Sequence, residues 1–177
     1  MMNPKARALI LTTAAALVVS VPLSAAKPSA AKPATAKPAT AKPGAARVIT
    51  LKATDDMKYD VTSITAKPGE ALLVKVVSVG KIPKFAMAHN FVLLTKGANA
   101  KAFSDQAMQA KATNHIPPAL KKQVVASTGL AGPGETVQVA FKAPTAPGKY
   151  EFICSFPGHY AAGMKGVLIV SAKPGKS

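Results

Sequence analysis

The single cysteine of this 177-residue chain is followed closely by two other residue types that bind metals. His159 and Met164 come after Cys154 with the spacing C-x4-H-x4-M, so a thiolate, an imidazole and a thioether share one short loop. A second histidine, His89, opens an apolar run far upstream. A soft thiolate, two imidazoles and a weak, long thioether contact form the trigonal site that binds copper in both oxidation states. These residue types therefore predict one copper ion bound by all four side chains.

Other uses of the same residues fit less well. Zinc prefers four strong ligands in a tetrahedron, and methionine is a poor fourth ligand for it. A catalytic cysteine needs a general-base histidine and an orienting Asn or Asp, but here Cys154 and His159 share one loop and Met164 would have no role. One cysteine also excludes an intramolecular disulfide and a four-thiolate cluster. We expect a protein that is not an enzyme.

The residues from 47 onward predict an all-β domain that would position this loop. Short β-rich runs are separated by turn sequences such as Pro68-Gly69 and Pro133-Gly134, which is typical of an antiparallel β-sandwich. The runs are 48–51, 59–64, 72–79, 89–94, 136–141, 149–154 and 166–170. Residues 97–131 interrupt the rhythm with Ala-, Lys- and Gln-rich stretches, which predict helices around 101–112 and 119–127. We expect this insertion to form one helical flap between strands, with His115 exposed on it.

The N-terminal residues predict export. A basic start, an apolar run from Ala8 to Val21 and a small-residue exit are typical of a secretory signal peptide spanning residues 1–26. Residues 27–46 are four five-residue repeats that each begin with Lys-Pro, which predicts a disordered, extended spacer rather than a nucleic-acid-binding arm. Residues 47–172 would then form the copper domain and 173–177 a short tail. In an oxidising compartment an unoccupied thiol is a liability, which favours a ligand role for Cys154 over simple core packing.

Two motifs resemble the azurin and auracyanin branch of the blue copper proteins, or cupredoxins. The first is Ala-His-Asn-Phe-Val-Leu at 88–93, and the second is Cys-Ser-Phe-Pro-Gly-His at 154–159, followed by Met-Lys-Gly at 164–166. The resemblance implies a Greek-key sandwich with one type 1 copper ion. The chain departs from azurins where Ala88 replaces a glycine, where four rather than three residues separate His159 from Met164, and in lacking the cysteines of an N-terminal disulfide.

The resemblance also implies roles for residues around the ligands. The carbonyl of Ala88 is available as a second axial group. Asn90 is expected to tie the His89 strand to the ligand loop, and Ser155 to hydrogen-bond near the sulfur and tune its charge. An apolar rim for partner docking is expected around the outer edge of His159. Its members are Met57, Met87, Phe156 and Pro157.

The expected function is that of an exported type 1 copper protein that carries single electrons in the periplasm or elsewhere outside the cytoplasm. Three histidines in total cannot supply the additional copper sites of a multicopper enzyme. Residues 47–177 contain 17 basic and 7 acidic residues, so their net charge of +10 favours acidic redox partners, such as a c-type cytochrome or an oxidase, or an anionic membrane face. We expect a monomer that binds no nucleic acid. The alternative is a copper carrier or storage module with the same fold.

Overall fold

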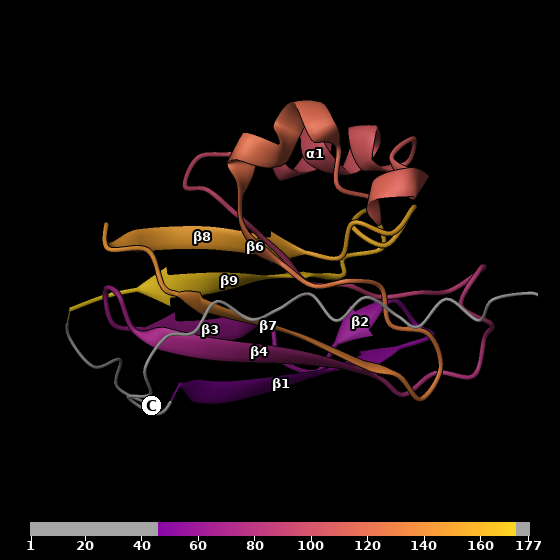
Figure 1. Cartoon of the computed structure of the whole chain (residues 1–177), viewed down its shortest axis with the longest axis horizontal. Coiled ribbons are helices and arrows are strands. Elements are labelled where there is room, and N and C mark those ends of the chain that lie inside the picture. Colours follow the sequence, from indigo (N-terminus) through magenta and orange to yellow (C-terminus); the bar gives the residue numbers. More distant parts are fainter. Residues whose placement is uncertain (1–45, 173–177) are drawn as a thin grey trace, which may run out of the picture. The chain divides into compact units, whose positions relative to one another are not determined.

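The computed structural model describes residues 46–172, which form two β-sheets packed face to face (Figure 1). Sheet A has the strand order β2 (Lys58–Tyr59), β1 (Arg47–Thr54), β4 (Ala71–Ser78), β7 (Thr136–Lys142). Sheet B has the order β3 (Ser63–Ala66), β9 (Lys165–Val170), β8 (Gly148–Ile153), β5 (Val92–Leu94), β6 (Val124–Ser127). The predicted signal peptide (1–26), all but the last residue of the predicted spacer (27–46) and the predicted tail (173–177) lie outside the described residues.

The sheets confirm the predicted β-sandwich but are not purely antiparallel. β1 pairs in parallel with β4, and β3 pairs in parallel with β9. The parallel β1–β4 pair arises because the chain leaves sheet A after β2, contributes β3 to sheet B and then returns to sheet A. The single run expected at 59–64 is therefore two short strands in different sheets.

Alternating side chains build the core between the sheets. Along β4 every second residue is buried, starting at Leu72, and Val74 and Val76 are fully enclosed. The facing residues of sheet B include Leu93 and Phe152, which belong to the same hydrophobic cluster, as does Phe91 just before β5. A period of two places these residues on one face of each strand, so the apolar pattern itself specifies which face is turned inward.

Two Pro-Gly turns in sheet A have the geometry that the sequence predicts. Gly69 and Gly134 adopt φ values of +72°, and each turn is closed by a backbone hydrogen bond, from Glu70 N–H to Lys67 carbonyl (3.1 Å) and from Glu135 N–H to Gly132 carbonyl (3.0 Å). Proline at the second position and a positive-φ glycine at the third are the requirements of a type II turn. These turns fix the starts of β4 and β7.

The flap covers the outer face of sheet B (Figure 1). It contains α1 (Ala100–Ala107) and two 3-10 helices, η1 (Lys111–Thr113) and η2 (Pro118–Gln123). Asn99 caps α1 by accepting a hydrogen bond from the Ala102 N–H (2.9 Å). Phe103 packs with β5 residues, which are buried on both faces for that reason. The helix expected at 119–127 ends at Gln123, because 124–127 instead pair with β5 as the edge strand β6.

Candidate metal centre

Cys154 and Met164 are the two ends of the loop that joins β8 to β9. These strands are adjacent and antiparallel, so the loop turns back on itself. The Cys154 N–H donates to the Met164 carbonyl (3.0 Å), which closes the loop at its base. The Met164 N–H donates to the His159 carbonyl (2.9 Å), and the Ala162 N–H donates to the Gly158 carbonyl (3.0 Å). Backbone hydrogen bonds therefore hold the three loop residues in place without a metal.

His89 approaches this loop from the neighbouring strand. It forms a β-bridge with Ala131, in which each N–H donates to the other residue's carbonyl (2.9 and 2.7 Å). The chain then enters β5, which is antiparallel to β8 with Val92 opposite Ile153. This register places residues just before β5 beside residues just after β8. Two segments more than sixty residues apart in the sequence therefore meet at one end of sheet B.

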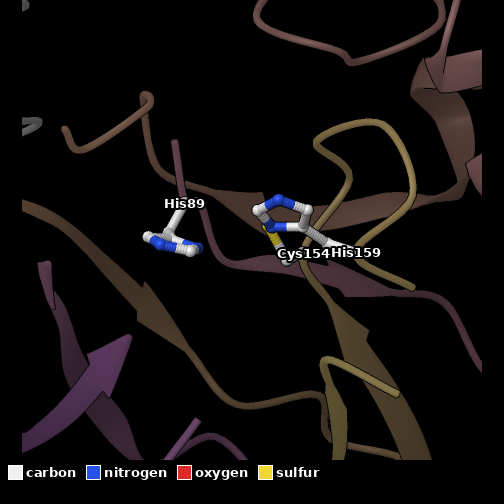
Figure 2. A group of neighbouring side chains, drawn as sticks. All are labelled: His89, Cys154 and His159. Carbon is white, nitrogen blue, oxygen red and sulfur yellow. The ribbon is translucent and has the colours of Figure 1, made fainter. Parts of the chain in front are cut away.

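The three strong donor residues form one buried cluster. The donor atoms of His89, Cys154 and His159 all lie within 4.8 Å of one another, and the Cys154 Sγ to His159 Nδ1 distance is 3.3 Å. Figure 2 shows the sulfur beside the His159 ring, with the His89 ring projecting towards both from its own segment. Cys154 and His89 are fully buried and His159 is 2% exposed. Met164, at the end of the same loop, is also fully buried.

Burial sets the protonation of the cluster in the metal-free protein. It lowers the pKa of His89, and it lowers the pKa of His159 to about 4, with the charges of His89 and His115 acting in the same direction. Both imidazoles are therefore neutral at pH 7, as metal binding requires. Burial raises the pKa of the Cys154 thiol to about 11, against opposing hydrogen bonds from neighbouring groups. Metal binding must therefore displace the thiol proton, which makes it pH-dependent.

The donor set fits a copper ion. Both ring nitrogens of His89 are buried and have no hydrogen-bond partner among residues 46–172, which is a costly arrangement for an imidazole unless another group occupies the space in front of it. Metal–nitrogen and metal–sulfur bonds of about 2.0–2.3 Å place donor atoms roughly 3–4 Å apart, within the range seen here. One thiolate and two imidazoles, with a buried thioether nearby, suit copper better than zinc.

Three further residues that the sequence singled out surround the cluster. The Ala88 carbonyl oxygen lies 3.9 Å from Cys154 Sγ, so it faces the donor atoms. Asn90 and Ser155 exchange two hydrogen bonds: Asn90 Nδ2 donates to Ser155 Oγ (2.9 Å), and the Ser155 N–H donates to Asn90 Oδ1 (2.9 Å). The Asn90 side chain thereby links the segment that carries His89 to the segment that carries Cys154.

The four residues expected to form the docking rim are all half-buried, namely Met57, Met87, Phe156 and Pro157. Among them, Phe156 packs against the candidate ligand His159, with its ring centroid 4.9 Å from that of His159. The rim residues therefore present part of their apolar surface to solvent, and the Phe156 ring covers the His159 ring.

Two residues that are linked to the site by sequence or by a hydrogen bond were not predicted to have a role. Phe85, four positions before His89, is 86% exposed, and it lies in a segment held by a Met87 N–H to Pro83 carbonyl bond (3.0 Å). Tyr59 donates a hydrogen bond from its hydroxyl to the Asn90 carbonyl. Phenylalanine in a loop and tyrosine in a strand are common in proteins. Nothing in the sequence therefore indicated that either residue is linked to the metal centre.

The expectation that His115 is exposed is wrong. His115 is 5% exposed, its Nδ1 lies 2.8 Å from the Ala107 carbonyl, and its ring meets Phe156 edge-on at a centroid distance of 5.2 Å. Asn114 and His115 both adopt positive φ (54° and 59°), which turns the chain inward at this point. The flap therefore contacts the ligand loop through His115 rather than projecting away from it.

Comparisons with known proteins agree with this geometry. A family model described as copper binding proteins of the plastocyanin/azurin family matches residues 46–171. Azurin from Alcaligenes faecalis is 33% identical over 123 residues, which cover 68% of this chain and 94% of that azurin. Auracyanin-B from Chloroflexus aurantiacus is 33% identical over 128 residues, covering 71% of this chain and 53% of auracyanin-B.

Solved structures give the same result at the level of the fold. The crystal structure of dithionite-reduced auracyanin from Roseiflexus castenholzii has a TM-score of 0.63 and 31% identity, covering 72% of this chain and 99% of that one. The chain belongs to the plastocyanin/azurin family of copper-binding proteins. Within that family it is an azurin- and auracyanin-like blue copper protein, with copper as its cofactor and electron transfer as its general function.

Proposed function

We propose that this protein is an exported carrier of single electrons that binds one copper ion through His89, Cys154, His159 and Met164. The observation that carries the proposal is the buried donor cluster, in which neither nitrogen of His89 has a hydrogen-bond partner in the part of the chain that the structure describes. The Met164 thioether is the fourth ligand because the residue is fully buried at the end of the ligand loop.

The surrounding residues would keep this site rigid and closed. Bound copper supplies a one-electron couple between Cu(II) and Cu(I). The loop hydrogen bonds and the Asn90–Ser155 pair hold the ligands in one geometry, so that little rearrangement accompanies electron gain or loss. Cys154 is fully buried and His159 nearly so, which leaves no open position for a substrate. We therefore propose electron transfer without catalysis.

Electrons would leave through His159 and the rim around it. Phe156 and Pro157 come from the ligand loop, and Met87 precedes His89 by two residues. We add Phe85 to this docking rim, because it is an exposed aromatic residue four positions before His89, and exposed aromatic side chains are suitable anchors for a partner. A Phe85→Ser variant should slow electron transfer to the physiological partner while leaving the absorption spectrum unchanged. An equivalent substitution at Met108, 47% exposed on the flap, is the control.

The N-terminal sequence supports export and electrostatic steering. The proposed signal peptide directs the chain out of the cytoplasm, and no helix among residues 46–172 is long and apolar enough to cross a membrane. The net charge of +10 on residues 47–177 favours acidic partners.

Deleting residues 27–46 should leave the reduction potential unchanged. It should slow encounter with an acidic acceptor only at low salt, because screening lengths fall to about 10 Å at 0.1 M. A full-length rate that is flat across ionic strengths would exclude steering.

One experiment separates the electron carrier from the copper carrier. Copper is added to purified metal-free protein, the visible spectrum is recorded, and the sample is then cycled by voltammetry before and after incubation with a strong chelator. An electron carrier should show reversible cycling and retain its copper for hours. Rapid loss of copper to the chelator without reversible cycling would support the carrier or storage function instead.

A further inference from the structure

The flap and the ligand loop meet through three successive rings. The ring of His115, in the flap, contacts the Phe156 ring edge-on, with a centroid distance of 5.2 Å and an interplanar angle of 70°. The Phe156 ring in turn packs against the His159 ring at a centroid distance of 4.9 Å. Both histidines are buried, whereas Phe156 is half-buried. The Phe156 ring is therefore in contact with both a candidate ligand and a residue of the flap.

Hydrogen bonds hold the His115 ring in this place. Its Nδ1 lies 2.8 Å from the carbonyl oxygen of Ala107, the last residue of α1. Because a carbonyl oxygen can only accept, Nδ1 carries a proton and donates it to this bond. The His115 backbone N–H donates to the Ala110 carbonyl (2.9 Å). Ring and backbone of His115 are thus both bound to the end of α1 and the segment that follows it.

The turn that carries His115 is itself well supported. Asn114 and His115 adopt φ values of 54° and 59°, a left-handed conformation in which asparagine and histidine are enriched among non-glycine residues. The Thr113 hydroxyl oxygen lies within hydrogen-bonding distance of two backbone carbonyls of the same turn (3.0 and 2.6 Å). The Asn90 side chain donates to the Asn114 carbonyl (3.3 Å). The turn therefore presents the His115 ring to the ligand loop in one defined place.

We propose that His115 is a positioning residue that latches the Phe156 ring over His159 and thereby restricts access to the metal centre. An edge-on aromatic pair stabilises one relative placement of its two rings. Without the His115 ring, the half-buried Phe156 side chain should leave its place more often, and reagents from solvent should reach the donor atoms during these local openings. The inference rests on the proposed copper site only for its consequence in the metal-loaded protein.

The chain offers a test variant and a control within the flap. His115→Asn removes the ring, and it adds little backbone strain because asparagine tolerates a positive φ. Leu120→Ala is the control. Leu120 lies in η2 and packs against the hydrophobic cluster around Phe103, whereas Phe156 packs against the cluster between the sheets. The control therefore loosens the flap without removing the contact between the His115 and Phe156 rings.

The first test uses metal-free protein and the disulfide reagent dithiodipyridine. Cys154 is the single cysteine and is fully buried. Its thiolate attacks the reagent, a mixed disulfide forms, and the thiopyridone that leaves is measured by its absorbance. His115→Asn should react about threefold to tenfold faster than wild type, and Leu120→Ala at the wild-type rate. An unchanged rate in His115→Asn, or equal increases in both variants, would overturn the proposal.

A double-mutant cycle shows whether His115 acts through Phe156. Phe156→Ala removes the ring that is latched, so it should speed the reaction at least as much as His115→Asn does. Adding His115→Asn to Phe156→Ala should then cause no further increase, because there is no ring left to hold. If the two increases multiply, His115 acts on the centre by another route and the latch is excluded.

One measurement needs no variant and holds even if His115→Asn does not fold. Nuclear Overhauser effects in the metal-free wild type should join the ring protons of His115 to those of Phe156, because the two rings are in edge-on contact. Absence of these effects from otherwise well-resolved ring signals would show that the rings are apart in solution and would overturn the latch.

The copper-loaded protein distinguishes failure of this inference from failure of the proposed function. His115→Asn should keep the position of the charge-transfer band, because all four proposed ligands are unchanged, and should release copper to a chelator faster than wild type and Leu120→Ala do. Equal release rates would overturn the latch while leaving the proposed function intact. If the wild type binds no copper, the proposed function fails, and the thiol reaction of the metal-free protein still decides the latch.

Discussion

The two sheets of the sandwich contribute differently to the metal centre. All four proposed ligands lie at strand ends or in a connection of sheet B: His89 before β5, Cys154 after β8, Met164 before β9 and His159 between the last two. Sheet A supplies inward-facing aliphatic side chains and one phenol hydroxyl. The difference teaches that sheet B supplies all the proposed donor atoms, whereas sheet A contributes to the domain mainly through core packing, although Cys154 and Met164 also belong to the core. The following predictions test this division between the sheets.

The largest expected effect is at Cys154. Cys154→Ser removes the thiolate, so copper(II) should no longer produce the intense absorption expected near roughly 600 nm for sulfur-to-copper charge transfer. The metal-free variant should still fold, because the loop is closed by backbone hydrogen bonds that do not involve the sulfur. Visible spectroscopy and thermal unfolding check the two halves of this prediction. Colour that survives in the variant would exclude Cys154 as the source of the absorption.

A core substitution in sheet A should instead lower the stability of the domain and leave the copper spectrum unchanged. Leu51 in β1 is fully buried, and Leu51→Ala should reduce the free energy of unfolding by about 3 kcal/mol. The folded fraction should keep the wild-type spectrum and potential, because Leu51 lies in the strand core and outside the donor cluster. Chemical denaturation followed by voltammetry at low denaturant measures both quantities. A shifted potential would show that the sheets are coupled more tightly than this division suggests.

The metal-free protein should lose stability in acid through its ligand histidines. The pKa of His159 is about 4 in the folded protein because of burial, whereas an unfolded histidine titrates near about 6.5. Between these values the unfolded chain binds more protons, so the free energy of unfolding should fall as the pH decreases, by at most about 3 kcal/mol for His159.

Thermal unfolding of metal-free wild type and His159→Asn between pH 7 and pH 4 tests this. The variant should show a shallower dependence, to which His89 still contributes because burial lowers its pKa, and to which Glu70 and Glu135 contribute near pH 4 because their hydrogen bonds lower the pKa of both carboxyl groups. Identical pH dependence in the two proteins would mean that His159 is not protonated on unfolding in this range.

The smallest expected effect is at Met164. Met164→Leu removes a weak donor that favours Cu(II), so the colour should remain and the reduction potential should rise. Met164→Gln supplies an oxygen donor and should lower the potential. If voltammetry finds both variants unchanged, Met164 is not an axial ligand, and the Ala88 carbonyl, 3.9 Å from the sulfur, becomes the candidate.

The features that the sequence predicted are those encoded locally. Cys154, His159 and Met164 are close in sequence, and a short loop between neighbouring strands brings them close in space. The Pro-Gly turns and the period-two pattern of β4 also depend only on adjacent residues. His89 was placed through the resemblance of a short motif, and the structure brings its ring to the cluster.

The features that were missed depend on contacts across the fold. Residues 59–64 form one β-rich run in sequence, but Tyr59 and Ile64 belong to different sheets, which no local pattern distinguishes. His115 was expected in solvent because it precedes Pro117-Pro118 in the flap, whereas two successive positive-φ residues, Asn114 and His115, accompany its packing onto Phe156. The hydrogen bond from Tyr59 to Asn90 joins the two sheets and becomes visible only once they are packed together.

The pairing of β9 with β3 governs when the metal centre can assemble. Ser63 lies opposite Val167, so the last strand of the domain is aligned on a strand near its beginning. Pairings of such large sequence separation are slow to form during folding, because a long loop must be closed first. Met164 directly precedes β9, and its carbonyl accepts the bond that closes the ligand loop. With the proposed ligand set, a chain still emerging from the ribosome would lack a complete site, so we expect copper insertion to follow synthesis of the final strand.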